Sequence, residues 1–295
     1  MLKQIEKMYV KPGSKVKLDK HPTDYKKKPV NKEEEKTLLN EGVSNIVRIQ
    51  EMLYSHNQYS VLIIIQAMDA AGKDSLVKHV LSGLNPTGVK VTPYGTPTKT
   101  ELEHDYLWRH NKALPGRGEI GIFVRSHYEN VLVTRVHPEY IVGENIPGYD
   151  KIDKIDKALF KTRFRQINDW ERYLTENGTK IIKIFLHSGK EEQKKQLMER
   201  IEDPAKHWKF NFGDIEERQL WDKYMVAYED LLNNTSTESA PWYIVPADDR
   251  WFARVAASKI IEHEMDKLHL HYPLPDAKLD EQLAKAKSIL LNEKE

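Results

Sequence analysis

The sequence contains no cysteine, so a disulfide framework, a thiol nucleophile and a thiolate metal site are all excluded. Long apolar runs are also missing, since the longest, beginning at Val61, is far shorter than the ~20 residues that a membrane-spanning helix needs. The N-terminal residues lack the apolar segment of a signal peptide. A net charge of only +1 gives the chain no overall attraction for nucleic acid or a membrane surface. These absences predict a cytoplasmic protein with neither nucleic acid nor membrane as its partner.

What is present is the composition of a globular protein with a heavily charged surface. The 295 residues suffice for one large domain or two small ones with a sizeable core. Charged residues make up 31% of the chain, and the mean hydropathy is -0.67. Many basic groups facing an acidic ligand would produce such a surface, so local clusters of charge must indicate the partner.

Apolar runs of strand length alternate with helical patterns along the chain. The apolar runs predict strands at residues 61–65, 89–93, 119–124, 180–187 and 242–245. The helical patterns lie between and around them, at residues 32–56, 75–84, 98–113, 154–176, 188–201, 214–231 and 250–268. Strands that alternate with helices are typical of parallel sheets. The sequence therefore predicts an α/β fold, a three-layer αβα sandwich around a central parallel sheet.

Local signals predict where several helices begin and end. Asn31 or Lys32 starts the first long helix, and Asn177 with Gly178 ends the helix of residues 154–176. Three further helix starts are predicted by pairs with the spacing of a capping box, namely Thr98 with Glu101, Ser188 with Glu191, and Asp214 with Glu217.

Changes in composition divide the chain into three parts. Residues 1–56 combine a basic arm with a packing helix, and their first 36 residues contain eleven Lys, no Arg and six acidic residues. We interpret this arm as irregular solvated surface, with a position near a polyanion as the alternative. Residues 57–270 form the core, in which the basic and aromatic residues 203–213 predict a loop over the site and a lid at about 200–222. Residues 271–295 form a helical tail with one apolar face, made of Leu279, Leu283, Ala286 and Leu290. This face would pack either on its own domain or on a second subunit.

The first candidate site is the turn that follows the apolar run at Val61. It ends in Gly72-Lys73 before a helical pattern begins, which is the order strand, phosphate loop, helix. Small residues at Ala70, Ala71 and Gly72 let successive backbone N–H groups turn inward around an anion. Lys73 then places a point charge on the phosphates. The alternative is a chance Gly-Lys pair after a buried strand.

This turn departs from the GxxxxGK[ST] pattern at two positions. Ala67 replaces the first Gly, and Asp74 replaces the Ser or Thr whose hydroxyl normally holds Mg²⁺. Another group must then hold the metal. A carboxylate at Asp69 would repel a bare polyanion and becomes favourable when a divalent cation lies between the two. Asp69 is therefore the predicted metal ligand, unless it is an ordinary turn residue.

The second candidate site follows the predicted strand at residues 119–124. Ligands in open parallel sheets bind beyond the carboxyl ends of the strands, where Arg125, Ser126 and Glu129 would project. Arg125 could clamp phosphate oxygens, and Glu129 could supply a second carboxylate to Mg²⁺ or position an acceptor. The alternative is a surface Arg-Glu pair at helical spacing, which is worth only ~0.2–0.5 kcal/mol and needs no function.

Together, the two candidate sites resemble the family-2 polyphosphate kinases, which are P-loop kinases that move phosphoryl groups between inorganic polyphosphate and nucleotides. Similarity extends over roughly residues 26–267, and motifs this long and ordered are far more specific than a phosphate loop alone. The resemblance implies a P-loop kinase-type fold with a helical lid. The matching stretches are MDAAGKDS (68–75), GLNPTGVKV (83–91), HDYLWR (104–109), RSHYENVLVTRVHPE (125–139) and RIEDPAKHWKF (200–210).

The resemblance also implies roles for individual residues. Lys73 and Arg125 would hold the phosphates at the reaction centre, and Asp69 and Glu129 would hold Mg²⁺, with Mn²⁺ as the alternative. Glu at position 129 resembles the branch of the family that phosphorylates both AMP and ADP. Val124 departs from the Asp or Asn that usually precedes Arg-Ser, which shifts the metal to Asp69 and Glu129. The remaining phosphate-binding or nucleotide-binding residues would be Ala70, Ala71, Gly72, Asp74, Ser75, Arg135, Arg200 and Lys209.

The predicted function is the reversible transfer of phosphoryl groups from polyphosphate to AMP and ADP, which gives ADP and ATP, by a homo-oligomer. A nucleoside mono- or diphosphate kinase that uses ATP as donor would share the same core. A nucleotide-binding module without turnover is the alternative from another class, favoured by Val124 and by the missing Ser or Thr after Lys73. The scattered histidines His104, His127 and His137 show no metal-ligand spacing, and we interpret them as surface or packing residues.

Overall fold

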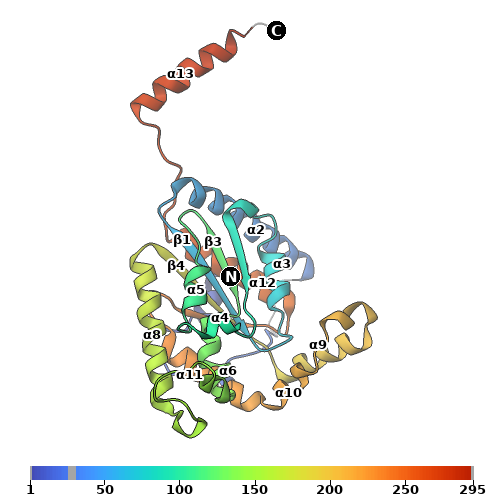
Figure 1. The fold of residues 1–295 in the computed structure, drawn as a ribbon. Helices are drawn as coiled ribbons and strands as arrows, with labels where there is room; N and C mark the ends of the chain where they lie inside the picture. Colours follow the sequence, from blue (N-terminus) through green and yellow to red (C-terminus); the bar gives the residue numbers. More distant parts are fainter. Residues whose placement is uncertain (1, 26–30, 294–295) are drawn as a thin grey trace.

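The computed structural model describes residues 2–25 and 31–293. Within these residues, five strands form one sheet in the order β2-β3-β1-β4-β5, and all neighbouring strands are parallel (Figure 1). The prediction of a parallel α/β sheet is confirmed. The strands are β1 (Ser60–Ala67), β2 (Val89–Pro93), β3 (Ile120–Val124), β4 (Thr179–His187) and β5 (Trp242–Pro246).

The central strand β1 contributes to two separate cores, one on each face of the sheet. Val61, Ile63 and Ile65 belong to one apolar cluster, and Leu62 and Ile64 belong to the other. Successive side chains of a strand point to opposite faces, so a strand buried on both faces must be apolar at every position. This is why the sequence shows a continuous apolar run here rather than an alternating one.

Helices cover both faces and complete the three layers (Figure 1). One face is covered by α2 (Lys32–His56), α3 (Lys73–Val80) and α12 (Arg250–Asp266), and the other chiefly by α8 (Lys157–Glu176) and α11 (Trp221–Thr235). The shorter elements are α1 (Leu2–Met8), η1 (Leu18–Lys20), η2 (Pro86–Gly88), α4 (Lys99–Leu102), α5 (Trp108–Lys112), η3 (His127–Val131), α6 (Val133–Val136), α7 (Glu139–Val142), η4 (Ile152–Lys154), α9 (Lys190–Glu202), η5 (Pro204–Lys209), α10 (Gly213–Gln219) and α13 (Ala277–Leu291).

Two of the predicted helix ends are confirmed by their capping contacts. The side chain of Asn31 accepts hydrogen bonds from the backbone N–H groups of Glu33 and Glu34, which closes a capping box at the start of α2. At the end of α8, Gly178 has a φ of 88°, the left-handed conformation that favours glycine after a helix.

The other predicted helix starts need correction. The Thr98 capping box is present, but it opens only the single turn α4, and a separate helix α5 follows. The box predicted at Ser188 is wrong, because the Ser188 hydroxyl donates to Asp248 at 3.0 Å and α9 begins after Gly189. Asp214 lies inside α10 rather than before it, and a break at Leu220 separates α10 from α11.

The two ends of the chain are arranged differently from each other. The N-terminal arm, expected to be irregular, contains the helix α1 and a bridge between Tyr9 and Tyr243 of β5, so its first part adds to the fold. The last part of the arm, at residues 26–30, lies outside the described residues. The C-terminal helix α13 extends away from the body (Figure 1). Among the described helices, none has the length and apolar character needed to cross a bilayer.

Candidate functional site

The turn between β1 and α3 has the backbone of an anion-binding loop. β1 ends at Ala67, and α3 begins at Lys73. Between them, Ala70 and Gly72 adopt positive φ angles of 61° and 95°. A positive φ favours glycine, and at Ala70 it is an uncommon conformation for a residue with a side chain. A turn with these φ angles in front of the α3 N-terminus is of the kind that binds anions through backbone N–H groups.

Lys73 and Asp69 lie at the mouth of this loop. The Lys73 ammonium donates to the carbonyl oxygens of Ala67 and Met68, at 2.8 and 3.0 Å, and lies 4.0 Å from the Asp69 carboxylate. The Asp69 carbonyl oxygen accepts a hydrogen bond from the Gln193 side chain of α9 at 3.0 Å. The loop is thereby tied to the segment that leads into the predicted lid.

The order of the strands brings Arg125 to the same place. β1 and β3 are neighbours, and their register pairs Ile65 with Val124, so both chains leave the sheet at the same edge. Arg125 has a φ of 60°, which turns it back toward the loop, and its guanidinium donates to Asp69 at 2.7 Å. Parallel pairing thus joins residues that are 56 positions apart in the sequence.

The charges at this centre influence one another strongly. Burial acts to raise the pKa of Asp69, but Lys73 and Arg125 together outweigh it, so the pKa is lowered and Asp69 stays ionised. Burial lowers the pKa of Lys73, with Asp69 opposing. For Arg125, burial is outweighed by Asp69 and Glu129, which raise its pKa. The result is a compact cluster of fixed positive and negative charge at the carboxyl edge of the sheet.

Glu129 lies beside this cluster on the short turn η3. The turn is capped by Ser126, whose hydroxyl accepts from the Tyr128 N–H at 3.2 Å and from the Gln66 side chain of β1 at 3.0 Å. Burial raises the pKa of Glu129, against the opposing effects of Arg125 and Lys73. Glu129 thus presents a second carboxylate, with a higher affinity for protons than Asp69, on the same side of the sheet.

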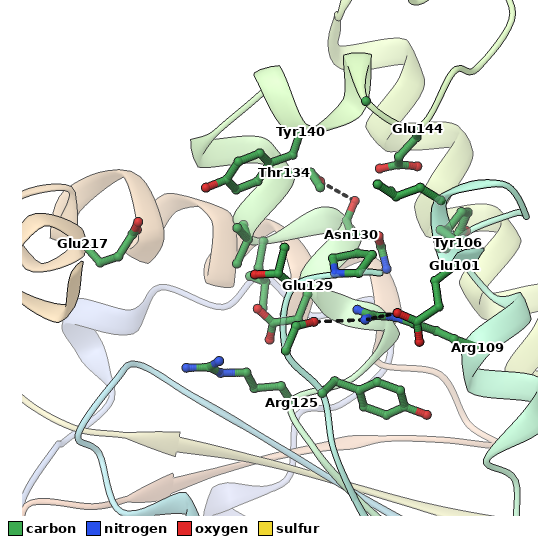
Figure 2. A pocket seen from close by; sticks show the side chains of 18 of the residues that line it. Glu101, Tyr106, Arg109, Arg125, Glu129, Asn130, Thr134, Tyr140, Glu144 and Glu217 are labelled. Carbon is green, nitrogen blue, oxygen red and sulfur yellow. Dashed lines mark hydrogen bonds and ion pairs between the residues drawn. The ribbon is translucent and has the colours of Figure 1, made fainter. Parts of the chain in front are cut away.

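Two adjacent cavities meet at these residues. The first has a volume of about 540 Å³ and lies between η3, α4, α7 and the region of α10 and α11 (Figure 2). The second has a volume of about 440 Å³ and lies in front of the phosphate loop, under η5 and the end of α9. Both cavities are lined by Asp69, Tyr94, Arg125 and Asp214. A group held at Asp69 and Arg125 can therefore be reached from either side.

The cavities differ in charge. Basic side chains predominate in the second, where the loop lysine is joined by Arg125, Arg200, Lys206, Lys209 and Arg250. The first contains Arg125 and Arg109, and Arg109 lies 3.7 Å from Glu101, as drawn in Figure 2. The first cavity is otherwise acidic, with the carboxylates Asp69, Glu101, Asp105, Glu129, Glu139, Glu144, Asp214 and Glu217 in its lining. A chain of anions fits the second cavity, whereas the first offers acceptors for a ligand rich in N–H and O–H groups.

The segment expected to form a lid lies beside the second cavity, and an ion pair joins its two ends. Arg200, at the end of α9, donates to Asp214 of α10 at 2.7 Å. Between them, η5 carries Lys206 and Lys209 toward the cavity, and the Trp208 side chain remains 79% exposed. The segment forms a protruding loop at one end of the molecule (Figure 1).

Most of the residues predicted from the sequence line one of the two cavities. Asp69 and Arg125 line both, and Glu129 lines the first. Arg135 lines neither, because its guanidinium pairs with Asp230 of α11 and stacks on Phe160. The remaining predicted residues line the second cavity, namely Ala70, Ala71, Gly72, Lys73, Asp74, Ser75, Arg200 and Lys209.

Sequence reasoning missed several residues of the lining. Arg250 lies four residues beyond the end of β5, and the same rule about carboxyl ends of strands could have found it. The sequence pattern predicts a helix cap at Asp214, but its side chain lines both cavities. Tyr94 follows β2 directly, and its ring lies 5.1 Å below the Arg109 guanidinium. The acidic residues of the first cavity come from several short elements, and no motif in the sequence joins them.

The carboxylates fit a Mg²⁺ ion that is held partly by its substrate. In the described part of the chain, no group of three or more His, Cys, Asp or Glu is arranged to hold a metal by protein ligands alone. Mg²⁺ is, however, typically bound by one or two carboxylates together with water and substrate phosphates. Asp69, ionised and lining both cavities, and Glu129, which lines the first, are oxygen donors of that kind.

Comparisons with known proteins show which family the chain is similar to. The chain matches the family model "Polyphosphate kinase 2 (PPK2)" over residues 29–272. It is 47% identical over 261 residues to an "ADP-polyphosphate phosphotransferase" of Rhodopseudomonas palustris, a match that covers 88% of this chain and 89% of the relative. It is 44% identical over 229 residues to an "AMP/ADP-polyphosphate phosphotransferase" of Meiothermus ruber, covering 78% and 80%. The crystal structure of polyphosphate kinase 2 from Arthrobacter aurescens superposes with a TM-score of 0.83 at 37% identity, covering 94% of this chain and 95% of that one.

Proposed function

The chain belongs to the polyphosphate kinase 2 family, and on this premise we propose that it transfers phosphoryl groups from inorganic polyphosphate to AMP and ADP, giving ADP and ATP in a reversible reaction. The observation that carries the proposal is the pair of cavities with different charge that meet at Asp69 and Arg125. A kinase of this kind must hold two anionic substrates on either side of one phosphorus atom. A nucleotide-binding module would need only one of the two cavities.

The second cavity supports the assignment of a polyphosphate donor site. Its lining carries six cations, from Lys73 at the loop to Lys206 and Lys209 on η5, more than the phosphates of one nucleotide require. Lysine and arginine neutralise phosphate oxygens by charge-assisted hydrogen bonds, which are roughly twice as strong as neutral ones. A polymer with one negative charge per phosphate matches such a set of cations.

The first cavity supports the assignment of a nucleotide acceptor site. A volume of about 540 Å³ lies within the usual range for small-ligand pockets. Its lining includes the aromatic rings of Tyr94, Tyr106 and Tyr140, which can pack against a base, and carboxylates that can accept from ribose hydroxyl and amino groups. Arg125 lies where the acceptor's phosphate would meet the donor chain.

In the proposed reaction, a terminal phosphate oxygen of AMP or ADP attacks the terminal phosphorus of polyphosphate. The new bond joins that oxygen to the phosphorus, the bond from the phosphorus to its bridging oxygen breaks, and the shortened chain leaves with the electron pair. Lys73 and Arg125 would hold the phosphate oxygens and neutralise the charge of the transferring group. The acceptor phosphate is already a nucleophile, so positioning is the main task of the protein.

Mg²⁺, or Mn²⁺ in its place, would be held by Asp69 and Glu129 and would neutralise phosphate charge. Asp69 would otherwise repel the incoming polyanion, which is why an acidic side chain inside the loop fits a metal-dependent enzyme. The Arg200–Asp214 pair would hold the lid over the donor chain and exclude water, so that transfer is faster than hydrolysis. These substrates and the lack of cysteine also fit a cytoplasmic enzyme.

The proposal is tested by incubating the protein with Mg²⁺, AMP and long-chain polyphosphate without ATP. We expect ADP first and then ATP, with one phosphate removed from polyphosphate for each bond formed. Product that forms only when ATP is supplied would instead indicate an ordinary nucleotide kinase. Nucleotide binding without product would indicate a module without turnover.

A matched pair of lysine variants tests the assignment of the donor site. Lys209→Met removes a cation of the second cavity, whereas Lys195→Met removes an exposed lysine of α9 that lines neither cavity. We expect Lys209→Met to raise the KM for polyphosphate by about fivefold, the effect of one partly exposed ion pair, and to leave the KM for AMP unchanged. Equal effects of the two variants would contradict the assignment.

A further inference from the structure

The C-terminal helix α13 is a separate unit that the proposed function does not use. It lies outside residues 29–272, which match the family. Asp276 caps it, accepting from the Leu279 N–H at 2.8 Å, and every residue from Ala277 to Leu291 is exposed. Figure 1 shows the helix pointing away from the body. A helix of 15 residues is only marginally stable in water by itself, so this one needs a partner.

The segment before α13 fixes the place from which the helix leaves the body. The carbonyl oxygen of His271 lies 3.3 Å from the His56 ring, and the Tyr272 hydroxyl lies 3.4 Å from Glu51, so the chain is held on α2 as far as Tyr272. The next residues, Pro-Leu-Pro, favour an extended and semi-rigid backbone. Leu274 within them is 88% exposed. This segment leads the helix outward rather than back onto its own domain.

One side of α13 carries an apolar seam of the coiled-coil type. Leu279, Leu283, Ala286 and Leu290 follow one another at spacings of four, three and four residues, which places them at alternating d and a positions of a heptad. Leu279, Leu283 and Leu290 are 43%, 54% and 66% exposed. An exposed seam with this spacing matches another helix of the same kind.

We propose that α13 pairs with α13 of a second copy of this chain, in antiparallel orientation. In that arrangement each a position faces a d position of the other helix, so Leu279 faces Leu290 and Leu283 faces Ala286. A large side chain then meets a small one in the central layers, which allows the two backbones to approach closely. By two-fold symmetry each contact occurs twice.

The charges beside the seam select this orientation. Asp280 and Lys287 both occupy e positions, and antiparallel helices bring the e positions of the two copies together. Asp280 of each copy then lies against Lys287 of the other. In a parallel pair, Lys287 would instead face the neutral Gln282, and Asp280 would face Pro275 before the helix. The opposite charges therefore match in the antiparallel pair alone.

Cysteine cross-linking of the full chain tests the pairing, because the natural sequence contains no cysteine. Leu283→Cys and Ala286→Cys are prepared separately and oxidised either alone or as an equal mixture. The antiparallel pair places position 283 opposite position 286, so the mixture should give severalfold more covalent dimer than either variant alone. A disulfide requires the two Cα atoms to lie within about 7 Å, which makes the assay specific for facing positions. The control is a mixture of Glu281→Cys and Ser288→Cys, which lie on the opposite side of the helix and should not cross-link.

A charge reversal gives a second measurement that does not depend on the fold of the body. Asp280→Lys, added to both cysteine variants, should lower the yield of the mixed dimer by about tenfold, because two attractive pairs become repulsive. Adding Lys287→Asp as well should restore the yield. Cross-linking of either single-cysteine variant alone at the level of the mixture would indicate a parallel pair. No excess in the mixture, or no rescue by the double reversal, would mean that α13 covers its own domain or another protein, and the proposal would fall.

Discussion

A buried ion pair between α8 and β4 supports the turn that carries Glu129. The Lys183 ammonium uses its three donors on Glu171 at 2.6 Å, the Tyr128 hydroxyl at 2.8 Å and the Thr235 carbonyl at 2.7 Å. The side chains of Lys183 and Glu171 are both 0% exposed. The Tyr128 hydroxyl also donates to Glu171, at 2.6 Å. Tyr128 directly precedes Glu129 in η3. The Lys183–Glu171 pair therefore holds the backbone of the candidate site in place through the Tyr128 hydroxyl.

We predict that Lys183→Met strongly destabilises the protein. Burial acts to raise the pKa of Glu171, but Lys183, with a smaller contribution from His127, outweighs it, so the pKa is lowered and the carboxylate stays charged. The substitution leaves either an uncompensated buried charge or a carboxyl group that must take up a proton. Breaking one side of a buried pair costs about 3–5 kcal/mol. For a chain of this size the expected fall in Tm is about 5–15 °C.

The assay is denaturant unfolding followed by circular dichroism, together with a thermal scan. Lys17→Met is the matched control, because Lys17 pairs with Glu229 at 2.9 Å but its side chain is 62% exposed, and its removal should leave the midpoint unchanged. Combining Lys183→Met with Glu171→Gln removes both charges, and the double variant should be more stable than the sum of the single effects by about 1–3 kcal/mol. A loss below 1 kcal/mol for Lys183→Met, or strict additivity in the double variant, would refute the reasoning.

Three further predictions concern the site and the response to pH. Asp69→Asn and Lys73→Ala should each abolish transfer to AMP and ADP while the unfolding midpoint stays near that of the parent, and substantial residual turnover in either would contradict the proposed roles. Glu129→Asn should lower kcat/KM for AMP by about tenfold more than for ADP, a difference of ~1.4 kcal/mol, and equal losses on both acceptors would count against its assignment. Glu264, bonded to Lys180, Lys267 and Tyr243, has a pKa lowered from 4.5 to about 2, with burial opposing these bonds. Because this pKa is lowered, its stabilising effect is present above pH 4.5 and is lost as the pH falls toward 2. Glu264→Gln should therefore cost about 3 kcal/mol at pH 7 and very little near pH 2. A constant cost across that window would show that the charge is not responsible.

The sheet could be predicted from the sequence because burial on both faces leaves an unmistakable pattern. The run at residues 61–65 is apolar at every position, the strand at residues 180–187 is apolar at five of eight, and the turns around them are short. Helix starts were less predictable, because a capping side chain can find a better partner elsewhere. Ser188 bonds Asp248 of the β5–α12 loop, a residue 60 positions away, and no local rule includes that competition.

In the site, too, the contacts that follow from strand order could be predicted, whereas those that depend on distant packing could not. The meeting of Asp69 and Arg125 follows from parallel pairing, since both residues leave neighbouring strands at the same edge. Arg135 was expected on the donor path because it lies in a matching motif, but α6 directs it toward Asp230 and Phe160. The direction in which a short helix points depends on tertiary packing, and sequence spacing does not contain it.

The pKa of Asp69 is lowered and that of Glu129 is raised, although the same two cations, Lys73 and Arg125, lie near both carboxylates. Lys73 and Arg125 act to lower the pKa of both carboxylates. Asp69 also accepts a hydrogen bond from Arg125 at 2.7 Å, and its pKa falls. At Glu129 the effect of burial is larger, and the pKa rises. The cations of the cluster are thus already engaged by Asp69, and too little positive charge remains to keep Glu129 ionised as readily. An arriving polyphosphate competes with Asp69 for the same two cations, and this increases the shortage. Two further sources of positive charge can neutralise the phosphates and carboxylates together. One is the set of cations that line the donor cavity, and the other is a divalent ion between the carboxylates and the phosphates. An acidic loop therefore requires a basic lid in this chain.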